Sequence, residues 1–128
     1  MIYVDTSVAL AHLLAEDQSP PAELWEQVLV SSRLIEYEMW TRLNARRLGG
    51  SHGEAARELL QRLALLELAP PVLARALEPF PVQVRTLDAL HLASIEFLRE
   101  QRQDVMLASH DARMQEAARR LGIALFAL

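Results

Sequence analysis

Short apolar runs alternate with longer amphipathic segments along this chain of 128 residues. The runs are too short for helices and consist largely of leucine, valine, isoleucine and alanine, which predicts strands buried on both faces. Such strands are expected at residues 1–4, 28–31, 105–108 and 123–126, with the apolar residues 65–68 as a further candidate.

The segments between these runs carry apolar residues at helical spacing and are bounded by glycine or proline. Thr6 or Ser7 is expected to cap the first helix, whereas Gly49-Gly50 and Gly122 are expected to end two later ones. Helices are predicted over residues 6–14, from 32 to the glycine pair, over 53–63, from 71 to before 79, over 86–100 and over 112–121, with one more helix start at 19–21. Strands that alternate with helices predict an α/β fold with a mostly parallel sheet.

Two acidic residues lie where such a fold places its ligand site. In open parallel sheets, ligands bind at the carboxyl ends of the strands. Asp5 follows the first strand directly, and Asp111 follows the strand at 105–108 by three residues, so both are expected at that edge. Capping of the next helix is an equally good interpretation of each residue.

Three further acids lie near the starts of helices. Asp88 lies among apolar neighbours in the first turn of the helix over 86–100, where dipole compensation or a salt bridge with Arg85 is the alternative to a functional role. Glu36 and Glu38 open the helix after the second strand, and periodicity does not choose between them. If one glutamate joins the three aspartates, the cluster needs cations, and oxygen ligands favour Mg²⁺ or Mn²⁺. The implied chemistry is metal-assisted phosphodiester hydrolysis.

The composition excludes several kinds of catalytic chemistry. All 13 basic residues are arginine, so lysine-based chemistry is excluded, and the lack of cysteine excludes thiolate nucleophiles and disulfides. The formal net charge of −4 argues against a broad basic surface for nucleic acid. Length and composition favour one domain over residues 1–128, and the absence of a targeting signal favours the cytoplasm and no membrane association.

Four motifs together resemble one known family. They are residues 3–8 (YVDTSV), 32–38 (SRLIEYE), 87–93 (LDALHLA) and 109–114 (SHDARM), and they follow one another in the family's order. They resemble the acidic motifs of PIN domains, and the chain as a whole resembles the VapC toxins of VapBC toxin–antitoxin pairs. The resemblance selects Glu38 over Glu36. It implies a three-layer sandwich with helices on both sides of the sheet, and a Mg²⁺- or Mn²⁺-dependent endoribonuclease.

The resemblance also implies roles for individual residues. Asp5, Glu38, Asp88 and Asp111 are expected to be the catalytic metal ligands, and Thr6 and Ser109 are expected to donate hydrogen bonds to them. Arg42, Arg46 and His110 are candidates for substrate binding; an exposed face that complements the helix dipole is the alternative for the arginines.

The implied partners are an RNA substrate, a small cognate antitoxin protein and a second copy of the chain in a homodimer. Two other functions compatible with the residues are a catalytically inactive PIN-like interaction module and a small phosphatase or deoxyribonuclease that uses the same ions. His91, inside Ala-Leu-His-Leu-Ala, is interpreted as a packed, hydrogen-bonded core residue.

Overall fold

Four parallel strands form the centre of the molecule. The computed structural model describes residues 1–15 and 19–128. Its sheet has the order β3-β2-β1-β4, and β1 in the interior pairs with β2 on one side and β4 on the other. The strands are β1 (Ile2–Val4), β2 (Leu29–Ser32), β3 (Ala64–Leu66) and β4 (Met106–Ala108). The expected parallel sheet is confirmed.

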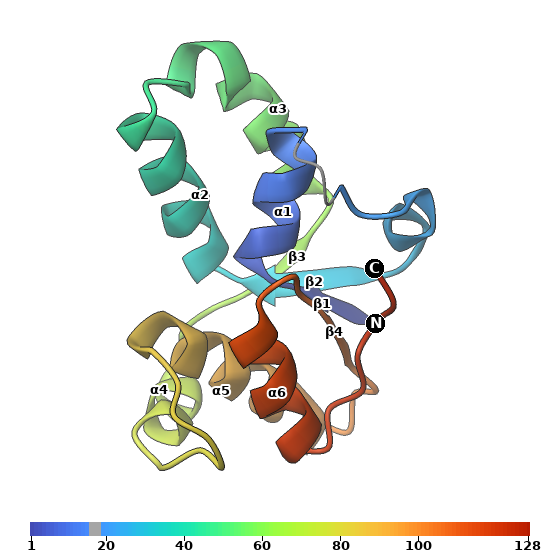
Figure 1. The fold of residues 1–128 in the computed structure, drawn as a ribbon. Coiled ribbons are helices and arrows are strands. Elements are labelled where there is room, and N and C mark those ends of the chain that lie inside the picture. The colour runs from blue at the N-terminus through green and yellow to red at the C-terminus, as the bar shows by residue number, and fades with distance from the viewer. Residues whose placement is uncertain (16–18) are drawn as a thin grey trace.

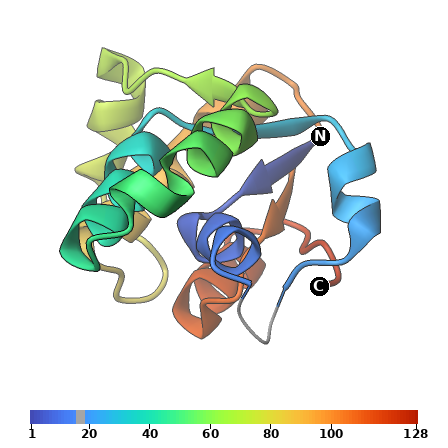
Figure 2. The same cartoon turned by 90° about the horizontal axis from the view of Figure 1, so that it is seen from above.

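Helices cover both faces of this sheet, with α1, α2 and α3 on one side and α4, α5 and α6 on the other (Figure 1). The helices are α1 (Thr6–Leu13), a 3₁₀ helix over Ala22–Glu26, α2 (Leu34–Ala45), α3 (Gly49–Gln61), α4 (Pro70–Ala76), α5 (Thr86–Glu100) and α6 (Ala112–Arg120). The three-layer α/β architecture is therefore confirmed. Seen from above, α1 lies over β1, beside α2 and α3 (Figure 2).

The strand alternation divides the core into two clusters. Ile2 and Val4 belong to the cluster under α1, α2 and α3, whereas Tyr3 between them belongs to the cluster with α5 and α6. Successive side chains of a strand point to opposite faces, so a strand of three buried residues contributes to both layers. Asp5, the next residue, is thereby held at the carboxyl edge of the sheet.

The predicted end of the helix that starts at residue 32 was wrong. Helix α2 ends at Ala45, because Arg47 adopts a left-handed conformation (φ 56°) and the Leu48 amide donates back to the Leu43 carbonyl at 2.8 Å. Gly49-Gly50 instead begins α3, four residues earlier than the predicted start at residue 53. Gly53 lies inside this helix, where glycine is needed because a Cβ would lie 3.0 Å from the Trp40 side chain on α2.

Three smaller expectations also differ from the structure. Asp5, rather than Thr6 or Ser7, occupies the position before α1, and it makes no side-chain cap. The helix start at 19–21 leads only to the 3₁₀ helix. Residues 123–126 form no strand, although Leu125 makes one isolated bridge with Leu107.

Within residues 1–15 and 19–128, no helix is both long enough and apolar enough to cross a bilayer.

Gly122 ends α6 as predicted. It adopts φ 74°, and the next amide, that of Ile123, donates to the Ala118 carbonyl at 2.8 Å. Because Ile123 is 3% exposed, this closure also anchors the chain after α6 in the core.

Gly122→Ala and Gly50→Ala should therefore change stability in opposite directions. Alanine at residue 122 must adopt the left-handed conformation, which costs roughly 1–2 kcal/mol. Residue 50 is exposed in α3 with open space around its Cα, so alanine there should stabilise by roughly 0.5–1 kcal/mol. Urea denaturation measures both values, and a stabilising Gly122→Ala would contradict the assigned helix end.

Candidate active site

Four carboxylates from four different segments line one pocket. Asp5 follows β1, Glu38 lies in the second turn of α2, Asp88 lies in the first turn of α5, and Asp111 precedes α6. All four line a pocket of about 520 Å³, which we call the acid pocket. The pocket lies where β1 and β4 end, as the rule for parallel sheets predicts.

The structure separates the two glutamates of the second motif. Glu38 lines the acid pocket, whereas Glu36 forms an ion pair with Arg33 at 2.7 Å and is not among the lining residues. Periodicity could not make this distinction, because both glutamates have apolar neighbours on α2.

Asp5 is buried and receives two hydroxyl hydrogen bonds at the same oxygen. Its Oδ2 accepts from Ser109 Oγ at 2.5 Å and from Ser7 Oγ at 3.0 Å. Ser109 Oγ also accepts from the Asp111 amide, and Ser7 Oγ accepts from the His110 amide, both at 3.0 Å. These bonds tie the loop after β4 to the turn between β1 and α1, so the positions of Asp5 and Asp111 are coupled.

Glu38 is held by a buried chain of polar side chains. Its Oε1 accepts from Thr6 Oγ1 at 2.9 Å and lies 2.5 Å from His91 Nε2, while His91 Nδ1 lies 2.6 Å from the Tyr3 hydroxyl. Burial raises the pKa of Tyr3, so the phenol keeps its proton. With Nε2–H directed to Glu38, His91 Nδ1 accepts from the Tyr3 hydroxyl when the imidazole is neutral and donates to the hydroxyl oxygen when the imidazole is charged.

The charge state of His91 depends on the same neighbours. The ring is 1% exposed, and this burial lowers its pKa. The hydrogen bond to Glu38 and the negative charges of Glu38, Asp5 and Asp88 outweigh burial, so the pKa of His91 is raised overall. His91 is thus the hydrogen-bonded core residue that its apolar surroundings predict, and it also positions Glu38.

Asp111 is both a helix cap and part of the acid pocket. Its Oδ1 accepts from the amides of Arg113 at 2.8 Å and Met114 at 3.4 Å, which caps α6. The capping interpretation therefore holds for Asp111, and it does not hold for Asp5. Asp111 also borders the acid pocket, so capping does not remove it from the site.

Asp88 is the carboxylate with the least compensation. Its Oδ2 is buried, and no hydrogen-bond partner for it exists within the described part of the chain. Burial raises the pKa of Asp88, the charges of Asp111 and Asp5 raise it further, and Arg85 and His91 oppose this only in part. The salt bridge with Arg85, the alternative to a functional role for Asp88, is not formed among the described residues.

The donor set fits a hard divalent cation. Asp5, Glu38 and Asp111 each make their hydrogen bonds through one oxygen, which leaves the second oxygen without a hydrogen bond from the residues described. Within those residues, no group of three or more His, Asp or Glu side chains is already arranged to hold a metal ion. Mg²⁺ binds through one or two carboxylates and keeps several waters, so such a group is not required.

The candidate substrate-binding residues are placed differently from one another. Arg42 lines the acid pocket, whereas Arg46 lies exposed just beyond the end of α2 and outside that pocket. His110 lines another pocket, formed with the C-terminal segment. Three polar residues of the site were not among the expected ones: Ser7, which bonds Asp5, and Arg85 and Thr86, which line the acid pocket. Ser7 lies in the first motif, two residues after Asp5, but the sequence indicated only a helix cap for it.

Comparison with known proteins gives matches over nearly the whole chain. A family model described as PIN domain matches residues 2–120. Ribonuclease VapC46 of Mycobacterium tuberculosis (strain ATCC 25618 / H37Rv) is 34% identical over 130 residues, covering 98% of this chain and 96% of that protein. Ribonuclease VapC47 of Mycobacterium tuberculosis (strain CDC 1551 / Oshkosh) is 30% identical over 129 residues, covering 95% of this chain and 93% of that protein.

Asp88→Asn should stabilise the protein in EDTA at pH 7. The raised pKa means that folding disfavours the ionised carboxylate, so the wild type loses stability as pH rises through that pKa. The amide removes this penalty and can donate to the neighbouring carboxylates. Urea denaturation at pH 7 should show the gain, and it should vanish below the ordinary carboxyl pKa of 3.8.

Asp104→Asn is the matched control, because Asp104 is exposed and lies before β4, at the opposite edge of the sheet. An Asp88→Asn protein that is less stable than the wild type at pH 7, or equally altered at both pH values, would contradict the electrostatic account of the acid pocket.

Proposed function

The chain belongs to the PIN domain family, and on this basis we propose that it is a metal-dependent endoribonuclease, the toxin of a VapBC-type pair. The observation that carries the proposal is the acid pocket, in which four carboxylates face one space at the carboxyl edge of the sheet. A cluster of like charges is costly to maintain, which favours a role in chemistry over a role in packing.

The four carboxylates would hold Mg²⁺ or Mn²⁺ between them. Such an ion, when bound, lowers the pKa of a water molecule and neutralises charge on a phosphodiester. The chain's own contribution is orientation: Ser7 and Ser109 fix the Asp5 carboxylate, and Thr6 and His91 fix that of Glu38. Because hydrogen bonds fix one oxygen of each carboxylate, the second oxygen is already oriented. Binding a cation would therefore cost little further side-chain entropy.

The proposal includes the partners and the compartment. RNA is the substrate, a small antitoxin covers the site, and the chain forms a homodimer in the cytoplasm. Apolar side chains exposed on the surface support protein partners. Tyr37 on α2 is 72% exposed and lines one pocket together with Leu87, which also borders the acid pocket. Exposed apolar area of this kind favours contact with another chain.

Purified protein should cleave structured RNA in Mg²⁺ or Mn²⁺, and excess EDTA should abolish the cleavage. Asp5→Asn should lower the rate by about 100-fold or more, because one of the carboxylates that would bind the cation loses its charge. Gel analysis of labelled RNA measures the rate, and circular dichroism checks that the variant is folded.

Asp104→Asn should retain wild-type activity. Full activity of Asp5→Asn, or cleavage undiminished by EDTA, would contradict the site assignment. A well-folded protein that cleaves no RNA would instead support the inactive interaction module, and a parallel panel of DNA and phosphomonoesters decides between ribonuclease and the other hydrolases.

A further inference from the structure

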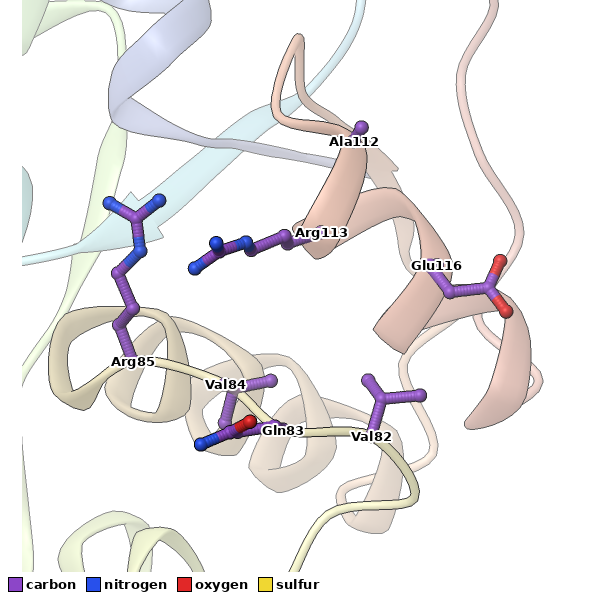
Figure 3. A pocket seen from close by; sticks show the side chains of 7 residues that line it. All are labelled: Val82, Gln83, Val84, Arg85, Ala112, Arg113 and Glu116. Atoms are coloured by element: carbon purple, nitrogen blue, oxygen red, sulfur yellow. The ribbon is translucent and has the colours of Figure 1, made fainter.

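A second pocket lies directly beside the acid pocket. It has a volume of about 750 Å³ and is lined by residues 82–85 of the loop before α5 and by Ala112, Arg113 and Glu116 of α6. We call it the arginine groove (Figure 3). Arg85 lines both pockets, so they adjoin at this side chain. The volume lies within the range of roughly 300–1,000 Å³ typical of small-molecule sites.

The two arginines of the groove make no direct ion pair among the described residues. Within the described part of the chain, neither Arg85 nor Arg113 forms an ion pair or a side-chain hydrogen bond. Figure 3 shows the Arg113 side chain extending towards that of Arg85, while the Glu116 carboxylate turns away. Glu116 is instead paired with Arg120 at 3.0 Å and Arg119 at 3.5 Å on the same helix. Glu116 is thus paired on its own helix, whereas Arg85 interacts with Asp88 only through its charge and without a direct ion pair.

The rest of the lining is apolar apart from Gln83. Val82 and Val84 are half-buried and pack against the core cluster shared by α5 and α6. Helix α5 begins next to them at Thr86. A positive rim beside an apolar wall matches a nucleotide, which has an anionic phosphate and an apolar base face.

Electrostatics around the acid pocket favour such a site. The chain has a net charge of −4, and four carboxylates face the space where a phosphodiester would react, so any negative charge there that bound cations leave uncancelled repels an RNA strand. Nearby arginines that make no direct ion pair within the described residues can offset this repulsion. Arg42 is one of them, on the α2 side of the acid pocket, and Arg85 and Arg113 are two others, on the α5 and α6 side.

We propose that the arginine groove binds the nucleotide next to the scissile phosphodiester of a single-stranded RNA segment, with Arg85 and Arg113 bound to its phosphate. The proposal rests on the proposed ribonuclease function. Guanidinium groups suit this task because their planar donor pairs match phosphate oxygens. Neither arginine takes part in bond cleavage, so their contribution should be to binding.

The test compares Arg85→Ala, Arg113→Ala and Arg113→Lys with Arg102→Ala. Arg102 is exposed, lies at the opposite edge of the sheet and changes the net charge equally, which makes it the matched control. Fluorescence anisotropy with a short labelled single-stranded RNA in Mg²⁺ gives Kd at several salt concentrations, and cleavage assays give kcat and KM.

Each alanine variant at the groove should raise Kd and KM by about tenfold with little change in kcat. The slope of log Kd against log salt should fall by about 0.7 for each phosphate that the variant no longer neutralises. Arg113→Lys should recover most of the salt slope, and Arg102→Ala should behave as the wild type. A general loss of structure would not produce this pattern, because it would lower kcat as well.

Unchanged Kd and salt slope in both alanine variants, with cleavage intact, would overturn the groove assignment and leave the ribonuclease proposal standing. If the same variants instead failed to bind an acidic peptide while RNA binding stayed normal, the groove would belong to a protein partner and the proposal would also fail. Weakened RNA binding in a chain that cleaves no RNA would support the groove and contradict the proposed catalysis.

Discussion

The pairing of β1 on both sides is the constraint on which the site depends. This strand has only three residues, yet each is buried and the strand is bonded to β2 and β4. The bonding continues beyond it, since the Asp5 amide donates to the Ala108 carbonyl at 3.0 Å and Ser31 Oγ donates to the Val4 carbonyl at 2.7 Å. Asp5 therefore has a fixed backbone position, and the loop carrying Asp111 is bonded to its side chain. The acid pocket is arranged around this one residue.

Gathering four carboxylates costs stability, and the fold offsets most of that cost with local donors. Asp5, Glu38 and Asp111 each accept two hydrogen bonds at one oxygen, from hydroxyls, an imidazole or helix amides. Asp88 has no such support for its buried oxygen within the described residues, and its raised pKa records the remaining cost. Functional sites commonly break the rules of polar satisfaction that the rest of a protein obeys. Asp88 is the place where a bound cation would relieve the largest unfavourable interaction.

Much of the fold could be predicted from the sequence because its signals are local. The helix over Thr86–Glu100 and the glycine closure at Gly122 follow from amphipathic spacing and a C-terminal glycine. Gly49-Gly50 was misassigned because a residue other than glycine, Arg47, adopts the left-handed conformation that ends α2, and the sequence carries no signal for it. For the same reason, residue spacing left Glu36 and Glu38 equivalent, and only their different partners separate them. Arg85 and Arg113 were missed because an unpaired arginine becomes visible only when its neighbours in space are known.

The central claim is that the acid pocket binds a divalent cation, and thermal unfolding with and without millimolar Mn²⁺ tests it most directly. A ligand that binds only the folded state stabilises it by about 2.7 kcal/mol at 100 times its Kd, so Tm of the wild type should rise by several degrees. The rise should shrink or vanish in Asp5→Asn and remain in Asp104→Asn. A wild-type Tm that does not respond to Mn²⁺, or an equal response in Asp5→Asn, would contradict the account.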